Sequence, residues 1–130
     1  MKEPAWIRAI EALAFHAQQI SWFGGSDGVR DRGLLESARA RPKNLFAYAD
    51  RALTMAELAA AYAVGIAGNH PFVDGNKRTA MQVAFVFLEF NGVLVTASQE
   101  EACLTFLSLA AGEITEAELA QWFERNTATR

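Results

Sequence analysis

The sequence predicts an all-α protein, a compact bundle of about six helices in a single domain over residues 1–130. Hydrophobic residues make up 52% of the 130 residues, which is enough for one substantial core. Apolar residues recur at helical spacing in most segments of the chain. Ser or Thr is followed three residues later by Glu at Thr54, Ser98 and Thr115, a pattern typical of a capped helix start.

The N-terminal third predicts two helices. The first covers about residues 4–23 and is closed by Gly24-Gly25. His16 falls off the apolar stripe of this helix, so we expect its side chain to be exposed. A second, shorter helix covers residues 31–41, and we expect Pro42 to end it because proline disrupts a helix interior.

The middle of the chain predicts a connection and two further helices. Residues 43–53 have no helical period and form either a plain loop or a flap over a site. The third helix starts at Thr54 and ends at Gly68-Asn69, which brings the chain directly to His70. The fourth, residues 76–90, is apolar on nearly every side and should therefore be central.

The C-terminal part predicts a short extended segment and two last helices. The extended segment covers residues 93–96. The helices cover residues 98–111 and 115–125, each after a capping residue. Residues 126–130 look like a frayed tail.

Charge and cysteine content exclude several classes of protein. A net charge of −3 argues against direct nucleic-acid binding, which needs a basic face. Five basic residues do cluster, but Asp31 and Glu36 lie among them, which favours a solvated face of mixed charge; the five are Arg30, Arg32, Arg39, Arg41 and Lys43. Cys103 is the single cysteine, so no internal disulfide forms, and its apolar neighbours predict a buried thiol.

No membrane segment is expected, because no uncharged apolar stretch reaches the roughly 18 residues that a span requires. Glu3 and Glu11 fall where the apolar core of a secretory signal would lie. We therefore expect a cytoplasmic protein.

The residues with the most chemistry lie together at the start of the fourth helix. The first turn of a helix has unpaired N–H groups and the positive end of the helix dipole, and both attract anions. Gly75 lets a ligand approach the backbone, and Asn76 offers an amide donor. Lys77 and Arg78 add positive charge where the dipole disfavours it, which indicates a negative ligand.

Two residues just before this turn have candidate catalytic roles. Histidine is the side chain whose unperturbed pKa lies near neutrality, so His70 is a candidate to take a proton from an attacking hydroxyl. Asp74 is suited to hold Mg²⁺, which takes one or two carboxylates and fills its other positions with phosphate oxygens and water. Taken singly, each residue has an ordinary structural interpretation, and it is their convergence that favours a phosphate site. Phe72 is expected to be buried and to hold the loop to the core.

Residues 70–78, His-Pro-Phe-Val-Asp-Gly-Asn-Lys-Arg, match the signature of the Fic/Doc superfamily. That signature is a histidine, any residue, Phe, any residue, Asp or Glu, Gly or Ala, Asn, Gly or Lys, and Arg. Fic proteins that transfer adenylyl groups carry Gly at the penultimate position, whereas Doc (death-on-curing) proteins carry Lys, as here at Lys77. Counting further similar segments, the chain resembles the Doc family over roughly residues 7–125; these segments are residues 23–26, 30–42, 87–92 and 112–114.

The resemblance implies an all-α fold with the motif between the third and fourth helices. It also implies the toxin of a bacterial toxin–antitoxin pair, a kinase that uses ATP and Mg²⁺ to phosphorylate a threonine of elongation factor Tu and so halts translation. It makes His70 the general base and Asp74 the metal ligand. The remaining motif residues would bind the nucleotide phosphates; these are Gly75, Asn76, Lys77 and Arg78. Lys77 would turn the γ-phosphate toward the acceptor hydroxyl.

Some features differ from the family pattern. Gly68 and Trp22 stand where some relatives carry a basic residue, which predicts fewer positive charges near the phosphates. No Glu is followed by Gly or Asn, so the self-inhibitory motif of many Fic proteins is absent. We therefore expect a separate antitoxin that acts in trans, through a segment that folds on binding. An adenylyltransferase and a catalytically silent nucleotide- or partner-binding module stay open as alternatives.

Overall fold

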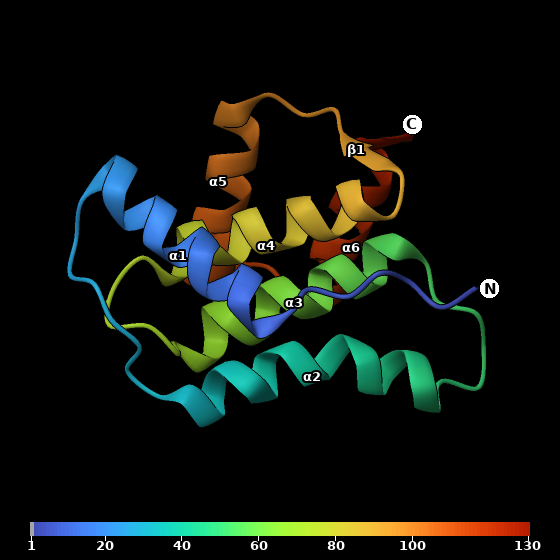
Figure 1. Cartoon of the computed structure of the whole chain (residues 1–130). Coiled ribbons are helices and arrows are strands. Elements are labelled where there is room, and N and C mark those ends of the chain that lie inside the picture. The colour runs from blue at the N-terminus through green and yellow to red at the C-terminus, as the bar shows by residue number, and fades with distance from the viewer. Residues whose placement is uncertain (1) are drawn as a thin grey trace.

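The structure, a computed structural model that describes residues 2–130, confirms the all-α prediction (Figure 1). Its helices are α1 (Ala9–Phe23), α2 (Arg32–Tyr48), α3 (Met55–Asn69), α4 (Asn76–Phe90), α5 (Gln99–Ala110) and α6 (Glu116–Arg125). Two short strands, β1 (Val93–Val95) and β2 (Thr127–Thr129), form an antiparallel pair. None of the helices within the described residues is both long and apolar enough to cross a membrane.

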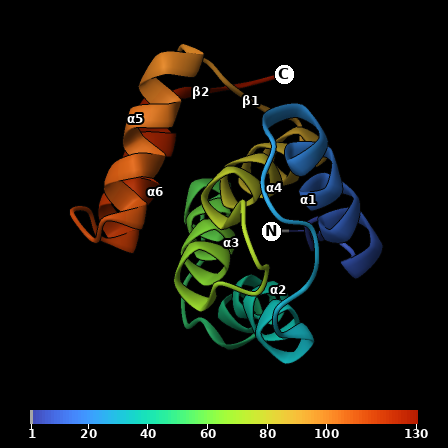
Figure 2. The ribbon, with the colours of Figure 1, turned by 90° about the vertical axis from the view of Figure 1, so that its left-hand side faces the viewer.

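Helix α3 lies at the centre of the bundle. It packs against α2, α4 and α6, and both views show it between α2 and α4 (Figures 1 and 2). Nine of its fifteen residues are buried, most of them alanines. The small side chains let neighbouring helices come close: a Cβ on Gly65 would lie 3.1 Å from the Ala38 Cα of α2. The sequence predicts α4 as the central helix; seven of its fifteen residues are buried, and its last residue, Phe90, is exposed.

Helix α2 passes through Pro42 and continues to Tyr48, so the predicted stop at Pro42 and the predicted loop over residues 43–48 are wrong. Proline removes one helical hydrogen bond. Here the Pro42 ring is buried, and the next turn is anchored by Phe46, which packs on the core and lies edge-on to Trp6 at 5.7 Å. These distant contacts favour a continuous helix over the break that the local sequence predicts.

The two ends of the chain are more ordered than expected. Helix α1 begins at Ala9, later than predicted, because the preceding residues pack in extended form and Ile7 N–H donates to the Tyr62 hydroxyl at 2.9 Å. The predicted frayed tail is wrong, since Thr127–Thr129 pairs with Val93–Val95. Beyond the pairs, Arg130 N–H donates to the Gly92 carbonyl at 2.7 Å.

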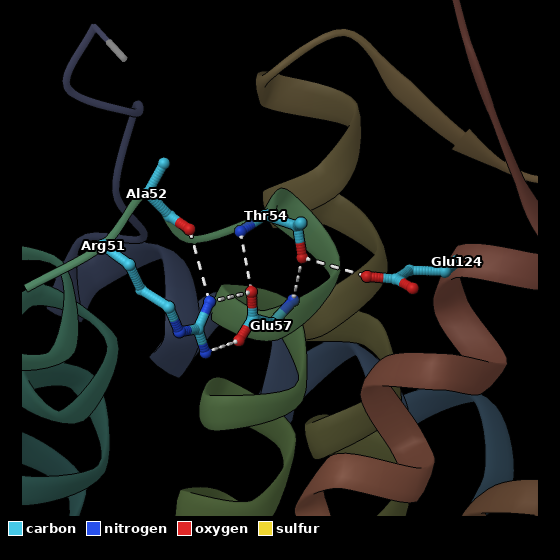
Figure 3. Close-up of polar contacts among 5 residues, drawn as sticks. All are labelled: Arg51, Ala52, Thr54, Glu57 and Glu124. Atoms are coloured by element: carbon cyan, nitrogen blue, oxygen red, sulfur yellow. Dashed lines mark hydrogen bonds and ion pairs between the residues drawn. The ribbon is translucent and has the colours of Figure 1, made fainter. Parts of the chain in front are cut away.

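The predicted helix caps are confirmed at α3 and α6, where both bonds of the capping box form. At α5, Ser98 accepts from Glu101 N–H at 3.1 Å, which is half of a box. At α3, Glu57 also accepts two bonds from the Arg51 guanidinium, and the Thr54 hydroxyl reaches Glu124 of α6 (Figure 3). These contacts fix the start of α3 to its neighbours, at the opposite end of the helix from His70.

Candidate active site

The loop of residues 70–75 joins α3 to α4 and leads directly into the first turn of α4. Gly75 is the N-cap and has a left-handed backbone with φ 77°, and no side chain caps the helix. Within residues 2–130, the backbone N–H groups of Asn76, Lys77 and Arg78 have no hydrogen-bond acceptor. The first turn of α4 therefore has the unpaired N–H donors that the predicted anion-binding site requires.

A second loop, residues 24–31 between α1 and α2, is bonded along its length to the motif loop. The backbone N–H groups of Arg30 and Asp31 both donate to the Pro71 carbonyl, at 2.7 and 3.0 Å. Val73 N–H donates to the Gly28 carbonyl at 3.1 Å, next to an isolated β-bridge between Val29 and Phe72. The two loops lie side by side at the end of the bundle that faces the viewer in Figure 2. They form one unit, although about forty residues separate them.

Arg30 contributes a side chain as well as backbone to this unit. Its Nε donates to the His70 carbonyl at 2.7 Å and its Nη2 to the Asn69 carbonyl at 2.8 Å. The guanidinium therefore satisfies carbonyls at the C-terminal end of α3 and fixes the backbone of His70, which is left-handed with φ 51°. Arg30 is exposed, as the prediction of a solvated face requires, but its bonds to these carbonyls of a distant segment were not predicted.

The other basic residues of that cluster behave as predicted for a face of mixed charge. Arg32 and Arg39 form ion pairs with Glu36, and Arg41 pairs with Glu116. Arg39 also donates to the Ile7 carbonyl at 2.9 Å. Their charges are used within the protein, which leaves this face without a free run of cations.

His16 is part of the site, although the sequence predicted an exposed side chain. It is only 3% exposed, and its ring stacks on Phe72 with centroids 3.9 Å apart and planes at 4°. Its Nε2 lies 2.8 Å from the Asp74 carbonyl; because a carbonyl can only accept, Nε2 carries the proton. The side of α1 that looked polar in the sequence packs on the motif loop. No local signal in α1 identifies this contact, since its partner is 58 residues away.

Asp74 presents an exposed carboxylate fixed by backbone donors. Oδ1 accepts from Gly75 N–H at 2.8 Å and Oδ2 from Ser26 N–H at 3.3 Å. These bonds, the Gly75 bond first, lower the pKa of Asp74, so the group is ionised at neutral pH. Gly25 makes room for it: a Cβ there would lie 2.6 Å from Oδ2. Among residues 2–130 no cluster of three or more His, Cys, Asp or Glu is placed to hold a metal, so Asp74 fits an ion that takes most of its ligands from elsewhere.

Asn76 shapes the loop, and its amide is already engaged. Its Oδ1 accepts from Phe72 N–H at 3.0 Å and its Nδ2 donates to the Phe72 carbonyl at 2.9 Å. The side chain is buried, and so is Phe72, as predicted. Asn76 was expected to offer its amide to a phosphate, but in this structure that amide holds the two ends of the turn together.

Arg78 and Lys77 line a cavity of about 350 Å³ between α1, α4 and α5. Arg78 Nη2 donates to the Gly24 carbonyl at 3.0 Å, and the guanidinium lies 5.4 Å from the centre of the Phe23 ring. Its Nε is buried and has no partner within residues 2–130. Lys77 is exposed at the rim. The two cations thus belong to a concave site with aromatic walls.

His70 lines a different hollow, of about 320 Å³, between the end of α3 and the α5–α6 turn. Its side chain is exposed. Helix α5 borders both hollows, with Cys103 on the cavity of the two cations and Leu109 on that of His70. The structure therefore brings Asp74 and the start of α4 together in one turn, while the imidazole and the two cations line neighbouring hollows.

Cys103 is exposed, so the prediction of a buried thiol is wrong. Helix α5 buries only Ala102 and Phe106, which are four residues apart and form a narrow stripe. Cys103 lies next to that stripe and opens onto the cavity of Arg78. Its apolar neighbours reflect this narrow contact, which leaves most of α5 in solvent.

A hollow of about 840 Å³, larger than those of His70 and of the two cations, lies between α2 and the second half of α3 and contains none of the predicted site residues. Its two cations, Arg41 and Arg51, are paired with Glu116 and Glu57. Size alone therefore does not identify the site, and the chemistry lies at the start of α4.

The chain is similar in sequence to known proteins. A model of the Fic/DOC family matches residues 6–88, which include both bonded loops. Protein kinase doc of Escherichia phage P1 is 39% identical over 115 residues, 88% of this chain and 90% of that protein. Toxin Doc of Mycolicibacterium smegmatis is 47% identical over 75 residues, 58% of each chain. The chain therefore belongs to the Fic/DOC family, and its relatives named here are Doc proteins.

Proposed function

We propose that this protein is the toxin of a bacterial toxin–antitoxin pair and acts as a protein kinase. Its two relatives are named as a protein kinase and as a toxin, which supports both parts of the proposal. One observation carries the kinase assignment. The first turn of α4 has no side-chain cap and has unpaired N–H groups, it contains the cations Lys77 and Arg78, and the ionised Asp74 directly precedes it. Phosphoryl transfer depends on such positioning and charge stabilisation more than on covalent chemistry by the protein.

ATP with Mg²⁺ is the donor that these residues fit. The Gly75 turn and the N–H groups of the first turn would receive phosphate oxygens, and the unpartnered Arg78 Nε is an orphaned donor beside them. Lys77 would supply further positive charge, and Asp74 would hold the metal through its free lone pairs. When bound, Mg²⁺ neutralises charge on the phosphates. Asn76 would contribute by keeping the turn in shape.

We propose that His70 meets a second, large substrate. It is exposed, outside the cavity of the two cations, and its backbone is fixed by Arg30. In the proposed step, the acceptor hydroxyl oxygen bonds to the γ-phosphorus, the bond from phosphorus to the bridging oxygen breaks, ADP leaves, and His70 takes the hydroxyl proton. A base of this kind contributes about 10²- to 10⁴-fold to the rate.

For the acceptor we propose a threonine hydroxyl of elongation factor Tu, which the resemblance to Doc proteins implies. Modification of elongation factor Tu would stop translation. Because translation takes place in the cytoplasm, we propose that the protein acts there. Control would come from a separate antitoxin acting in trans. With a net charge of −3 and the arginines of its basic cluster engaged in internal contacts, the protein itself is not expected to contact nucleic acid.

The test is transfer from labelled ATP to elongation factor Tu. We expect label from γ-labelled ATP and a mass increase of one phosphate, both lost in His70→Ala and Asp74→Ala. Asp50→Ala removes an exposed carboxylate far along the chain from the motif and should transfer normally. Label from α-labelled ATP would show that the adenylyltransferase alternative is correct. No transfer, together with normal growth of bacteria that express the protein strongly without antitoxin, would favour the silent binding module.

A further inference from the structure

The cavity of Lys77 and Arg78 has aromatic walls that packing does not explain. Trp22 and Phe23, the last residues of α1, are 62% and 57% exposed, and their rings lie edge to face at 6.5 Å. Both line the cavity, opposite Phe106 of α5. Large aromatic side chains are normally buried or placed at binding sites, so two exposed ones beside two cations indicate a ligand.

The two aromatic residues have different local roles. Phe23 lies under the Arg78 guanidinium, 5.4 Å from it, and so helps to hold that cation. Trp22 has no such partner and borders two hollows at once, because the cavity shares Gln19, Trp22, Met81 and Gln99 with a neighbouring hollow of about 400 Å³. Trp22 is therefore available to stack on a planar group of a ligand that extends from the phosphate site into this cavity.

Polar side chains at the edge of the cavity are suited to form hydrogen bonds with the edge of such a planar group. Gln19 is buried and donates to Gln82 Oε1 at 2.5 Å, and Gln82 in turn donates to Gln18 at 2.7 Å. Gln19 keeps its own carbonyl oxygen as an acceptor. Gln99 lies across the cavity at the start of α5. Amide groups of this kind bond the donors and acceptors on the edge of a nucleobase.

We propose that this cavity is the base subsite of the nucleotide, and that Trp22 is the residue that stacks on the purine. The inference rests on the proposed ATP-dependent function and identifies where the apolar end of that substrate lies. A nucleotide has an anionic end and a planar aromatic end, and this cavity is lined by both the Arg78 cation and the Trp22 ring. Its volume of about 350 Å³ lies in the range of small-molecule sites.

The test separates base binding from phosphate binding. Calorimetry would measure the affinity of the full-length protein for ATP with Mg²⁺ and for inorganic tripolyphosphate with Mg²⁺. Loss of one stacking side chain weakens binding of a base by roughly 5- to 150-fold. We expect Trp22→Ala to lose ATP affinity by such a factor and to keep its tripolyphosphate affinity. Trp22→Phe should recover most of the ATP affinity.

Tyr48→Ala is the matched control, because Tyr48 is 85% exposed and lies at the end of α2, on a different hollow. It should bind both ligands like the unmutated protein. Unchanged ATP affinity in Trp22→Ala, or equal loss for both ligands, would overturn the base subsite and leave the kinase proposal intact. If the unmutated protein bound neither ligand, both proposals would fall. A base seated elsewhere, with Trp22 serving the antitoxin, would appear as unchanged ATP affinity together with weaker antitoxin binding.

Discussion

His16 shows that the motif loop depends on a residue outside the motif. Its ring stacks on Phe72 and its Nε2–H donates to the carbonyl of Asp74, the proposed metal ligand. Residues that orient a ligand in this way typically change activity by about 10- to 100-fold when they are replaced. We therefore expect His16 to act by positioning Asp74.

We expect His16→Phe to keep the stack and remove the donor. Phosphate transfer should fall by at least about tenfold, mainly in kcat, because the Asp74–Gly75 turn loses its support. The free energy of unfolding should fall by only about 1 kcal/mol, the typical worth of one hydrogen bond. Initial rates over a range of ATP concentrations, with urea unfolding as the stability check, measure both. A variant with an unchanged kcat would show that the bond has no positioning role.

Gly25 and Gly24 offer a matched pair for the same turn. Both have positive φ, 116° and 80°, so alanine strains the backbone at either position. Only at Gly25 would the new Cβ meet Asp74, at 2.6 Å; at Gly24 nothing lies within 4 Å. We expect both variants to lose some stability and only Gly25→Ala to need more Mg²⁺ for half-maximal activity. Equal Mg²⁺ requirements would show that the carboxylate tolerates the displacement.

Glu57 gives the fold a defined pH dependence. The Arg51 guanidinium, followed by the Thr54 cap, lowers the pKa of Glu57 to about 2, against an ordinary value of 4.5 (Figure 3). A lowered carboxyl pKa stabilises the folded state above pH 4.5, and this contribution is lost as the pH falls from 4.5 to 2. Glu57→Gln should cost about 1 kcal/mol at pH 7, and the difference should vanish near pH 2. Urea unfolding across this range measures it, with the exposed Glu113→Gln as the control.

At the scale of elements, the sequence predicts those helices whose start signals are local. Thr54 and Thr115 cap α3 and α6 as expected, and Gly75 precedes α4. The errors lie where distant contacts decide. Helix α2 continues past Pro42 because Phe46 meets Trp6, and the last residues form β2 because β1 is there to receive them. Local patterns do not contain that information.

The site follows the same rule. The signature located the turn at Asp74, and the first turn of α4 has the unpaired donors it predicted. His16 and Arg30 were missed because each meets a backbone carbonyl of the motif loop from roughly 40 to 60 residues away in the chain. Helical periodicity describes which residues face one core, and it does not show which of them face a loop.

The pairing of β1 with β2 allows a test of whether the C-terminal end of the chain is ordered or frayed. A chain truncated after Asn126 lacks β2 and exposes β1, whose Val93 and Val95 pack against the core. We expect a loss of about 1–3 kcal/mol, the worth of a few hydrogen bonds and their covered apolar surface. The midpoint of urea unfolding measures it, and Ala128→Pro, which removes a ladder donor without shortening the chain, should show part of it. A midpoint unchanged in both would mean that the tail contributes nothing.

Taken as a whole, the molecule is a bundle around α3 with its chemistry at one end. Two loops from distant parts of the chain close that end, and α5 borders both hollows beside them. Helix α5 buries little of its own surface, so a ligand between α1, α4 and α5 adds contacts that the free protein lacks. Binding should therefore stabilise the entire fold and not only the loops.

This stabilisation is measurable as a shift in unfolding temperature. A ligand present at 100 times its Kd adds about 2.7 kcal/mol, which corresponds to several degrees for a chain of this size. We expect ATP with Mg²⁺ to raise the unfolding temperature of the unmutated protein and of Asp50→Ala. Asp74→Ala should lose the part of the shift that depends on Mg²⁺ and keep the part that ATP gives in the presence of a chelator. A shift of equal size with and without Mg²⁺ in every variant would argue against Asp74 as the metal ligand.

The backbone of residue 70 shows what the proposed chemistry requires of the fold. A left-handed conformation costs an ordinary residue about 1–2 kcal/mol, and glycine avoids that cost. Yet histidine occupies this position, with Arg30 bonded to its carbonyl. If only the stability of the fold mattered, glycine would be preferred at this position. With histidine there, the protein is less stable than the same fold with glycine would be. An inactive descendant of this protein would be free to drift toward the more relaxed residue.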